Sequence, residues 1–150
     1  MLAACGSKPP EPPKPVSVSG RYVAAPDLNP SVSNRPSPLL VRVYELRSAT
    51  AFNRADFMAL YNADSTTLAA DLVAREETML QPGESRTFSK VLSPDTRFVA
   101  VVGAYRELER ATWRSVVAVP APAVPSPKSG PVQLVIRADA RAVSATVQQP

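Results

Sequence analysis

The chain has 150 residues, with 17 Lys and Arg against 13 Asp and Glu, and it contains no histidine. A chain of this length forms one domain with its own core, and without histidine it lacks the commonest general base and zinc ligand. Its basic residues are scattered and have no aromatic residues set among them, so we do not expect nucleic acid as a partner.

Cys5 is the only cysteine, which excludes a disulfide within the chain. It follows L-A-A and precedes Gly6, an arrangement that resembles a bacterial lipobox, in which the chain is cut before a cysteine that then carries lipid. We therefore expect lipid on Cys5 and interpret residues 1–4 as the remnant of a signal peptide, since a complete one has roughly 15–30 residues. No other stretch approaches the roughly 20 apolar residues of a membrane span.

The segment after Cys5 is rich in proline. Residues 6–15 read G-S-K-P-P-E-P-P-K-P, which favours polyproline II at about 3.1 Å per residue and predicts a stiff spacer of about 30 Å. We interpret residues 5–15 as a lipidated cysteine with its tether, and residues 16–150 as the folded domain.

Residues 16–24 alternate between apolar and polar positions and predict a first strand, in which we expect Gly20 to mark a bulge.

Residues 25–38, A-P-D-L-N-P-S-V-S-N-R-P-S-P, are long for a connection, and their four prolines favour a shaped loop. Leu28 and Val32 have polar neighbours there. We expect both to be exposed on a contact surface, the alternative being a solvated loop.

Residues 39–44 alternate as a second strand, with Leu39, Val41 and Val43 on one face. The apolar spacing then changes to three and four residues and predicts a short amphipathic helix over residues 52–61. A second short helix is expected after a cap at residues 64–67 and is predicted to carry Leu68 and Leu72.

The rest of the chain alternates between short strands and turns. Strands are predicted over residues 75–80, 86–92, 96–105, 113–119, 132–138 and 142–147, with turns at 81–84 and 93–95, a charged connection at 106–112 and a proline-rich loop at 120–131. The most apolar strand, 96–105, is expected at the centre of its sheet. The fold class is therefore mainly β, an antiparallel β-sandwich of about eight strands with a short helical insertion after the second strand.

Acidic residues give no sign of a catalytic site. Glu76 and Glu77 are neighbours on a strand and point to opposite faces, so they cannot share one substrate. Asp64 and Asp71 are interpreted as a helix cap and a residue of a solvated face. A screened surface network is expected for Arg106, Glu107, Glu109 and Arg110. With no phosphate-binding glycine motif either, we predict no enzyme, cofactor, metal or small-molecule substrate.

Aromatic residues leave one alternative function open. Trp113, with Tyr22 or Tyr44, could stack on a sugar ring, which would make the chain a periplasmic ligand-binding lipoprotein for sugar or cell-wall material. A partly buried core tryptophan is the simpler interpretation of Trp113.

Several segments together resemble one known family. They are L-A-A-C, then D-L-N-P-S-V-S-N-R-P-S-P followed by L-L-V-R-V-Y-E-L, then A-F-N-R-A-D-F-M-A-L-Y, L-Q-P-G-E-S-R-T and the strand that leads to Trp113 and Arg114. In order and spacing they are similar to the outer-membrane lipoprotein subunit of the bacterial type VI secretion system, the TssJ family. The resemblance covers residues 16–147.

The resemblance implies a transthyretin-like sandwich with extra helices and a lipid anchor in the inner leaflet of the outer membrane, with the domain in the periplasm. It implies as partner the periplasmic C-terminal region of the inner-membrane subunit TssM, which with TssL forms the trans-envelope complex.

The direction of the strands suggests where a partner would bind. If the strands alternate in direction, the connections at 26–38, 81–84 and 106–112 share the end away from the tether, unless a Greek-key crossing breaks the alternation. Interface energy concentrates in few residues, and we expect Leu28, Asn29, Val32 and Arg35 to be the anchors. The whole predicted partner-binding set is Asp27, Leu28, Asn29, Pro30, Ser31, Val32, Ser33, Asn34, Arg35, Pro82, Gly83, Arg106, Glu107 and Arg110.

Overall fold

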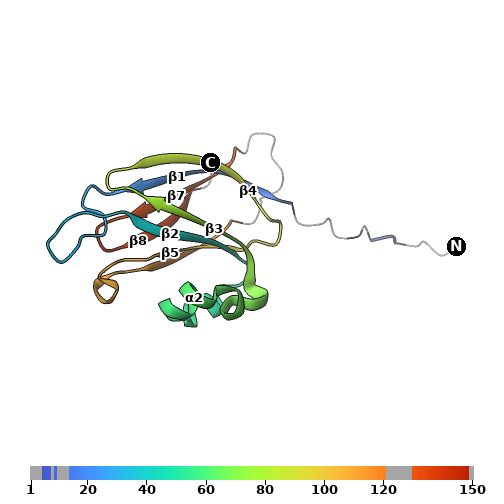
Figure 1. The fold of residues 1–150 in the computed structure, drawn as a ribbon. Helices are drawn as coiled ribbons and strands as arrows, with labels where there is room; N and C mark the ends of the chain where they lie inside the picture. The colour runs from blue at the N-terminus through green and yellow to red at the C-terminus, as the bar shows by residue number, and fades with distance from the viewer. Residues whose placement is uncertain (1–4, 8, 10–13, 121–129, 149–150) are drawn as a thin grey trace.

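The computed structural model describes residues 5–7, 9, 14–120 and 130–148. In this part of the chain, eight strands form two four-stranded sheets in the orders β4-β1-β7-β8 and β3-β2-β5-β6 (Figure 1). The strands are β1 (Val16–Ala24), β2 (Leu39–Leu46), β3 (Leu72–Leu80), β4 (Ser85–Leu92), β5 (Phe98–Gly103), β6 (Arg114–Ala118), β7 (Val132–Ala138) and β8 (Val143–Gln148). The helices are α1 (Thr50–Arg54), α2 (Phe57–Leu68) and the 3-10 turns η1 (Ala69–Asp71) and η2 (Leu108–Arg110). The predicted eight-stranded sandwich is confirmed.

Some predictions fall outside the described residues. Most of the predicted proline-rich loop, residues 121–129, lies outside them. Residues 1–4, interpreted as the signal-peptide remnant, and positions 8 and 10–13 of the tether lie outside them too. The longest helix among the described residues, α2, has 12 residues, and none of these helices is long and apolar enough to cross a membrane.

β2 separates two apolar layers because successive side chains of a strand point to opposite faces. Val41 and Val43 lie in the core between the sheets, as predicted, whereas Tyr44 and Leu46 lie on the outer face of their sheet. The helices cover that outer face (Figure 1). Phe52 packs there from α1, and Leu60 and Leu68 pack there from α2. Val99, Val101 and Leu134, also expected in the core, are buried between the sheets.

One pair of strands departs from the predicted antiparallel arrangement. Five pairings among the described strands are antiparallel, but β1 and β7 pair in parallel, from Val18 opposite Val132 to Ala24 opposite Ala138. The reason is topological. In a chain whose strands alternate in direction, the first and seventh strands run the same way, so bringing them side by side makes a parallel pair. β5 is an interior strand of its sheet, as predicted.

The helical insertion is divided differently from the prediction. The first predicted helix is two helices, because Ala55 is extended and Asp56 caps α2 by accepting a hydrogen bond from the Ala59 amide at 2.8 Å. The second predicted helix is wrong in its extent. The chain kinks at Ala63 within α2, the helix ends at Leu68, and Leu72 begins β3.

Asp64 and Asp71 are engaged more closely than the sequence suggested. Asp64 is a buried residue of α2, and its Oδ2 lies 2.5 Å from Arg75 Nη1 and 3.4 Å from Arg42 Nη1. Asp71, interpreted as a residue of a solvated face, is partly buried and accepts a hydrogen bond from the Ala51 amide at 3.4 Å. The Asp64 carboxylate therefore joins the helical insertion to β2 and β3, and the Asp71 carboxylate joins the end of the insertion to α1.

Gly20 does not mark a bulge. β1 and β4 pair without a register shift, and Gly20 stands opposite Phe88. A methyl group on Gly20 would overlap the Phe88 ring, so glycine is needed here for close packing.

Candidate functional site

Connections after β1, β3 and β5 meet at one end of the sandwich. The Gly83 amide donates a hydrogen bond to the Ala25 carbonyl at 3.1 Å, and the Arg106 amide donates one to Asn29 Oδ1 at 2.9 Å. These bonds join residues 25–38, 81–84 and 104–113, as the alternation of strands predicts. No crossing breaks this alternation among the described strands, since every pairing fits strands that alternate in direction.

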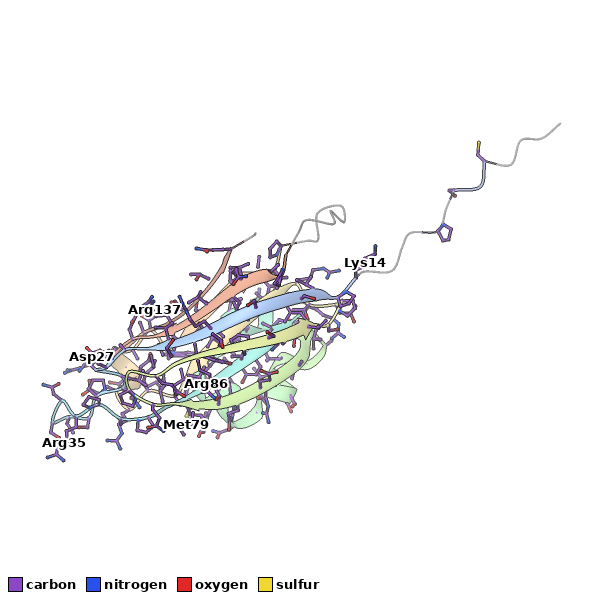
Figure 2. The ribbon with its side chains drawn as sticks, turned by 90° about the horizontal axis from the view of Figure 1, so that it is seen from above. Lys14, Asp27, Arg35, Met79, Arg86 and Arg137 are labelled. Carbon is purple, nitrogen blue, oxygen red and sulfur yellow. The ribbon has the colours of Figure 1, made fainter. Side chains whose placement is uncertain are left out.

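The same end lies away from the start of β1. Figure 2 shows Asp27 and Arg35 at one end of the molecule and Lys14, which precedes β1, at the other. We call the first of these the loop end and define it as residues 25–38, 81–84, 104–113 and 139–142.

The connection after β7, residues 139–142, belongs to the loop end and was missed from the sequence. The Thr112 amide donates to the Arg141 carbonyl at 2.8 Å, and the Tyr105 hydroxyl donates to the Asp139 carbonyl at 3.0 Å. Burial, and then the negative charge of Asp139, raise the pKa of Tyr105, so its hydroxyl stays protonated as a donor. The strand alternation was the signal that could have found this turn, since it also places the connection after the seventh strand here.

The base of the long loop is buried, which corrects the expected anchors. Leu28 exposes 0% of its surface and Asn29 only 4%, and Pro30 is buried as well. Leu28 packs in the core between the sheets, and the Ser37 amide donates to its carbonyl at 2.9 Å. The loop folds back over the end of the sandwich, so tertiary contacts cover an apolar residue that has polar neighbours in the sequence. Leu28 and Asn29 therefore hold the base of the loop against the sandwich and are not exposed anchors for a partner.

The tip of the loop, residues 31–35, is compact and exposed. The Ser31 amide donates to the Arg35 carbonyl and the Asn34 amide to the Ser31 carbonyl, both at 2.9 Å. The Arg35 amide donates in turn to Ser31 Oγ at 3.3 Å. Val32 is 97% exposed, and Ser33, Asn34 and Arg35 are exposed beside it. The tip thus presents an aliphatic side chain and a guanidinium on a turn held by its own hydrogen bonds.

The turn after β3 has the predicted chemistry. Gly83, in the third of its four positions, has a φ of 77°, which favours glycine, and the Glu84 amide donates to the Gln81 carbonyl at 3.0 Å. Pro82 is partly buried and Gly83 is exposed. This turn flanks the long loop.

The charged connection after β5 is paired differently from the expected network. Arg106, Glu109 and Arg110 are exposed, and the described structure shows no ion pair that joins them to one another or to Glu107. Instead, Glu107 Oε2 lies 3.2 Å from Arg141 Nε across the end of the sandwich. This pair joins the connection after β5 to the one after β7.

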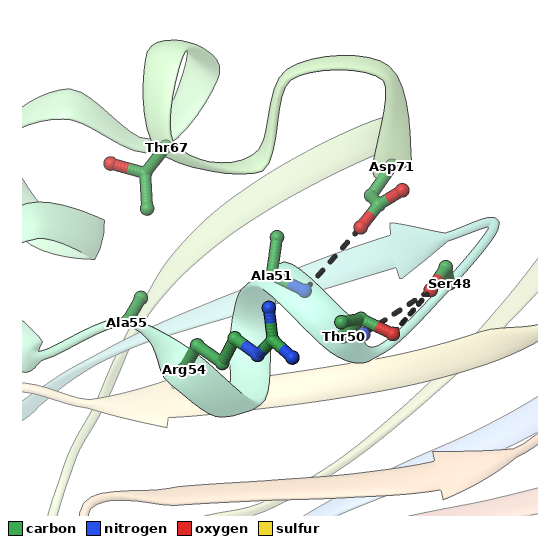
Figure 3. A pocket seen from close by; sticks show the side chains of 7 residues that line it. All are labelled: Ser48, Thr50, Ala51, Arg54, Ala55, Thr67 and Asp71. Carbon is green, nitrogen blue, oxygen red and sulfur yellow. Dashed lines mark hydrogen bonds between the residues drawn. The ribbon is translucent and has the colours of Figure 1, made fainter.

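A shallow depression of about 540 Å³ lies beside α1 (Figure 3). Its lining residues are Ser48, Thr50, Ala51, Arg54, Ala55, Thr67 and Asp71. Most of its polar side chains already form hydrogen bonds within the protein. Ser48 Oγ donates to Thr50 Oγ1 at 3.1 Å, and Thr67 Oγ1 donates to the Ala59 carbonyl at 3.1 Å. The depression therefore offers a ligand few free polar groups.

The aromatic residues proposed for sugar binding are largely packed inside. Tyr44 is fully buried, and Tyr22 is 7% exposed with its ring 4.9 Å from that of Phe88. Trp113 is partly buried, and its ring meets the Phe57 ring edge-on at 5.4 Å. Tyr22 and Tyr44 therefore cannot present a ring face to a sugar, and Trp113 is a packing residue.

Cys5 is exposed, with a free thiol. Among the described residues, no group of three or more Cys, Asp or Glu side chains is arranged to hold a metal ion.

Comparisons with known proteins relate the chain to a secretion system. The family profile for type VI secretion lipoproteins (VasD, EvfM, TssJ) matches residues 17–141. A search of curated proteins finds no match. The crystal structure of the lipoprotein TssJ1 of the type VI secretion system from Pseudomonas aeruginosa is 40% identical, with a TM-score of 0.80, and the match covers 90% of this chain and 98% of that one.

Two further structures share the fold. Serratia marcescens Lip, described as a membrane-bound component of the type VI secretion system, is 26% identical with a TM-score of 0.79, over 88% of this chain and 98% of that one. A chain of a type VI membrane complex is 25% identical with a TM-score of 0.70, over 91% and 99%. The profile match across most of the domain and the 40% identity to TssJ1 show that this chain belongs to the type VI secretion lipoprotein family, the TssJ family.

Proposed function

We propose that the chain is the outer-membrane lipoprotein of a type VI secretion membrane complex and that its loop end binds the periplasmic C-terminal region of TssM. Lipid on Cys5 holds it in the inner leaflet of the outer membrane, residues 5–15 form the tether, and residues 16–150 form the domain in the periplasm. It acts as a structural adaptor, not as an enzyme, and is connected to TssL through TssM.

The observation that carries this proposal is the course of β1. The strand begins beside Lys14 and ends at the long loop, and nine residues at about 3.3 Å each separate the two ends by about 30 Å. A domain tethered at the Lys14 end directs its loop end away from the lipid. A partner rooted in the inner membrane approaches from that side.

The tip of the long loop has the properties of a docking element. Val32 is an aliphatic side chain with almost its whole surface in water, and the hydrogen bonds between Ser31 and Arg35 fix the turn that carries it. Because the turn is ordered before binding, less conformational entropy is lost when a partner covers it. Arg35, Arg106 and Arg110 are exposed around the same end and suit acidic groups of a partner.

The relatives support the proposed setting. Serratia marcescens Lip is described as membrane bound, and another similar chain comes from a type VI membrane complex. The TssJ family likeness supports TssM as the partner within such a complex.

The test uses the full chain with Cys5→Ser, which removes the acylation site, and the purified periplasmic C-terminal region of TssM. We expect saturable binding, and we expect replacement of residues 31–35 by a Gly-Ser segment of equal length to weaken it at least about tenfold. Buried Leu28 and Asn29 stay unchanged so that the fold is kept. No saturable binding of the parent protein would refute the partner, and unchanged affinity of the folded tip variant would refute the surface.

A further inference from the structure

One buried residue, Asn29, joins three segments of the loop end through its side chain and its backbone. Asn29 Oδ1 accepts a hydrogen bond from the Arg106 amide at 2.9 Å, and its Nδ2 donates to the Pro38 carbonyl at 2.9 Å. Its backbone amide donates to the Ala140 carbonyl at 3.0 Å, and its carbonyl accepts a hydrogen bond from the Ser37 hydroxyl. Asn29 thus connects the two ends of its own loop to the connections after β5 and β7.

The backbone at Asn29 explains why this residue type stands there. Its φ is 46°, in the left-handed region that glycine adopts freely and asparagine tolerates better than most residues. That reversal lets the chain turn between Leu28, which enters the core, and the exposed tip at 31–35. Glycine would satisfy the backbone, but it would provide neither the donor nor the acceptor of the amide.

We propose that Asn29 is a positioning residue for partner binding: its side-chain amide holds the tip at 31–35 in a fixed place relative to Arg106 and to the end of the loop at Pro38. With an exposed fraction of 4%, it offers a partner almost no surface. The inference rests on the proposed function, because it assigns a role within that same docking surface.

The consequence for affinity follows from the populations of the loop. When a protein binds only in one conformation, its apparent Kd rises by the inverse of the fraction in that conformation. Removing the Asn29 amide leaves the Arg106 N–H and the Pro38 carbonyl without their partner and allows the tip other positions. A loop that keeps the docking position only about one-fifth of the time binds about fivefold more weakly.

Two variants separate the amide from the backbone. Asn29→Asp is nearly the same size and keeps an acceptor for the Arg106 amide, but it cannot donate to the Pro38 carbonyl. Asn29→Gly keeps the left-handed backbone and removes both side-chain bonds. If one variant fails to fold, as shown by its circular dichroism and thermal transition, the other carries the test.

The experiment measures binding of the full chain with Cys5→Ser to the purified periplasmic C-terminal region of TssM. We expect each folded Asn29 variant to bind at least about fivefold more weakly. We also expect the Asn29 variants to lower the association rate constant and to leave the dissociation rate constant at the parent's value, because fewer free molecules hold the tip in the docking position. Val32→Ser removes a contact and should instead raise the dissociation rate constant. A purely structural role of Asn29 would lower stability but leave both rate constants of the folded protein unchanged.

The outcomes distinguish this inference from the proposed function. If Val32→Ser weakens binding while folded Asn29 variants bind like the parent, the positioning role is refuted and the docking surface stands. A loss of affinity in the Asn29 variants that lies wholly in a faster dissociation rate also overturns the positioning role. If neither position affects binding, the docking surface itself is refuted and the role of Asn29 falls with it.

Discussion

The ring of Phe88 lies against the α-carbon of Gly20 on the neighbouring strand, in the place that a larger residue's side chain would take. The Phe88 ring also packs at 4.9 Å from the ring of Tyr22. The contact between β1 and β4 therefore depends on the absence of a side chain at position 20, close to the middle of the strand that connects the tether to the loop end.

Gly20→Ala should destabilise the fold by about 1–3 kcal/mol, because the added methyl group forces the Phe88 ring out of its site. Chemical unfolding measures the change. Gly130→Ala is a matched control, since nothing lies within 4 Å of a methyl group there. Adding Phe88→Leu to Gly20→Ala should recover part of the loss, and equal destabilisation by the two Gly→Ala changes would contradict this account of the packing.

Asp64→Asn should destabilise the fold by about 2–3 kcal/mol, because it leaves Arg42 and Arg75 without their shared buried carboxylate. The value is below the roughly 3–5 kcal/mol for breaking a fully buried pair because Arg75 is half exposed to water. Glu77→Gln is the control: Glu77 contacts the same Arg42 at 2.7 Å but is exposed, so its loss should cost less than about 1 kcal/mol. Similar losses for both variants would contradict the assigned importance of burial.

The effect of Asp64→Asn should also depend on pH. Burial raises the pKa of Asp64, but the hydrogen bond and charge of Arg75, the Ser65 amide and the Tyr44 hydroxyl together bring it below its ordinary value of 3.8. A carboxyl group with a lowered pKa in the folded state stabilises that state fully above the ordinary value, and this stabilisation is lost as the pH falls through the folded-state pKa. The difference in unfolding free energy between the parent and Asp64→Asn should therefore be smaller at pH 3 than at pH 7. A difference that grows in acid would contradict the lowered pKa.

Cys5→Ser, expressed with a complete signal peptide, should release the domain as a soluble periplasmic protein. Lipid chains supply the membrane affinity, and durable anchoring takes more than one chain. Fractionation of cells that lack the TssM partner measures this, with the parent protein as the control. Recovery of Cys5→Ser in the outer-membrane fraction of such cells would contradict lipid anchoring through this residue.

Local patterns predicted the strands well because each side chain's burial follows from its place in the alternation. Residues 16–24 and 132–138 have the predicted bounds as β1 and β7. Their parallel pairing could not be predicted, since the register between distant strands leaves no local pattern. The burial of Asp64 could not be predicted either, because the arginines that contact it, Arg42 and Arg75, come from β2 and β3 and are distant in the sequence.

The position of the candidate site in the fold could be predicted from the sequence, but the residues exposed on its surface could not. Strand alternation placed the connections at 26–38, 81–84 and 106–112 together, and the bonds from Gly83 to Ala25 and from Arg106 to Asn29 confirm it. The exposure of Leu28 was predicted wrongly because polar neighbours in the sequence do not show that a loop folds back over the core. Partner binding by these residues stays a prediction.

The most direct test of the central claim compares two exposed valines at opposite ends of the sandwich. Val32 is 97% exposed at the loop tip, and Val91 is 63% exposed on β4, opposite Ser17 near the start of β1. The affinity of each Val→Ser variant for the TssM periplasmic region is measured in the full chain with Cys5→Ser. Burying a valine contributes about 1.5–3 kcal/mol, so Val32→Ser should weaken binding about tenfold or more, and Val91→Ser should bind like the parent. A loss of affinity in Val91→Ser with none in Val32→Ser would show that the partner binds the tether end and would contradict the account.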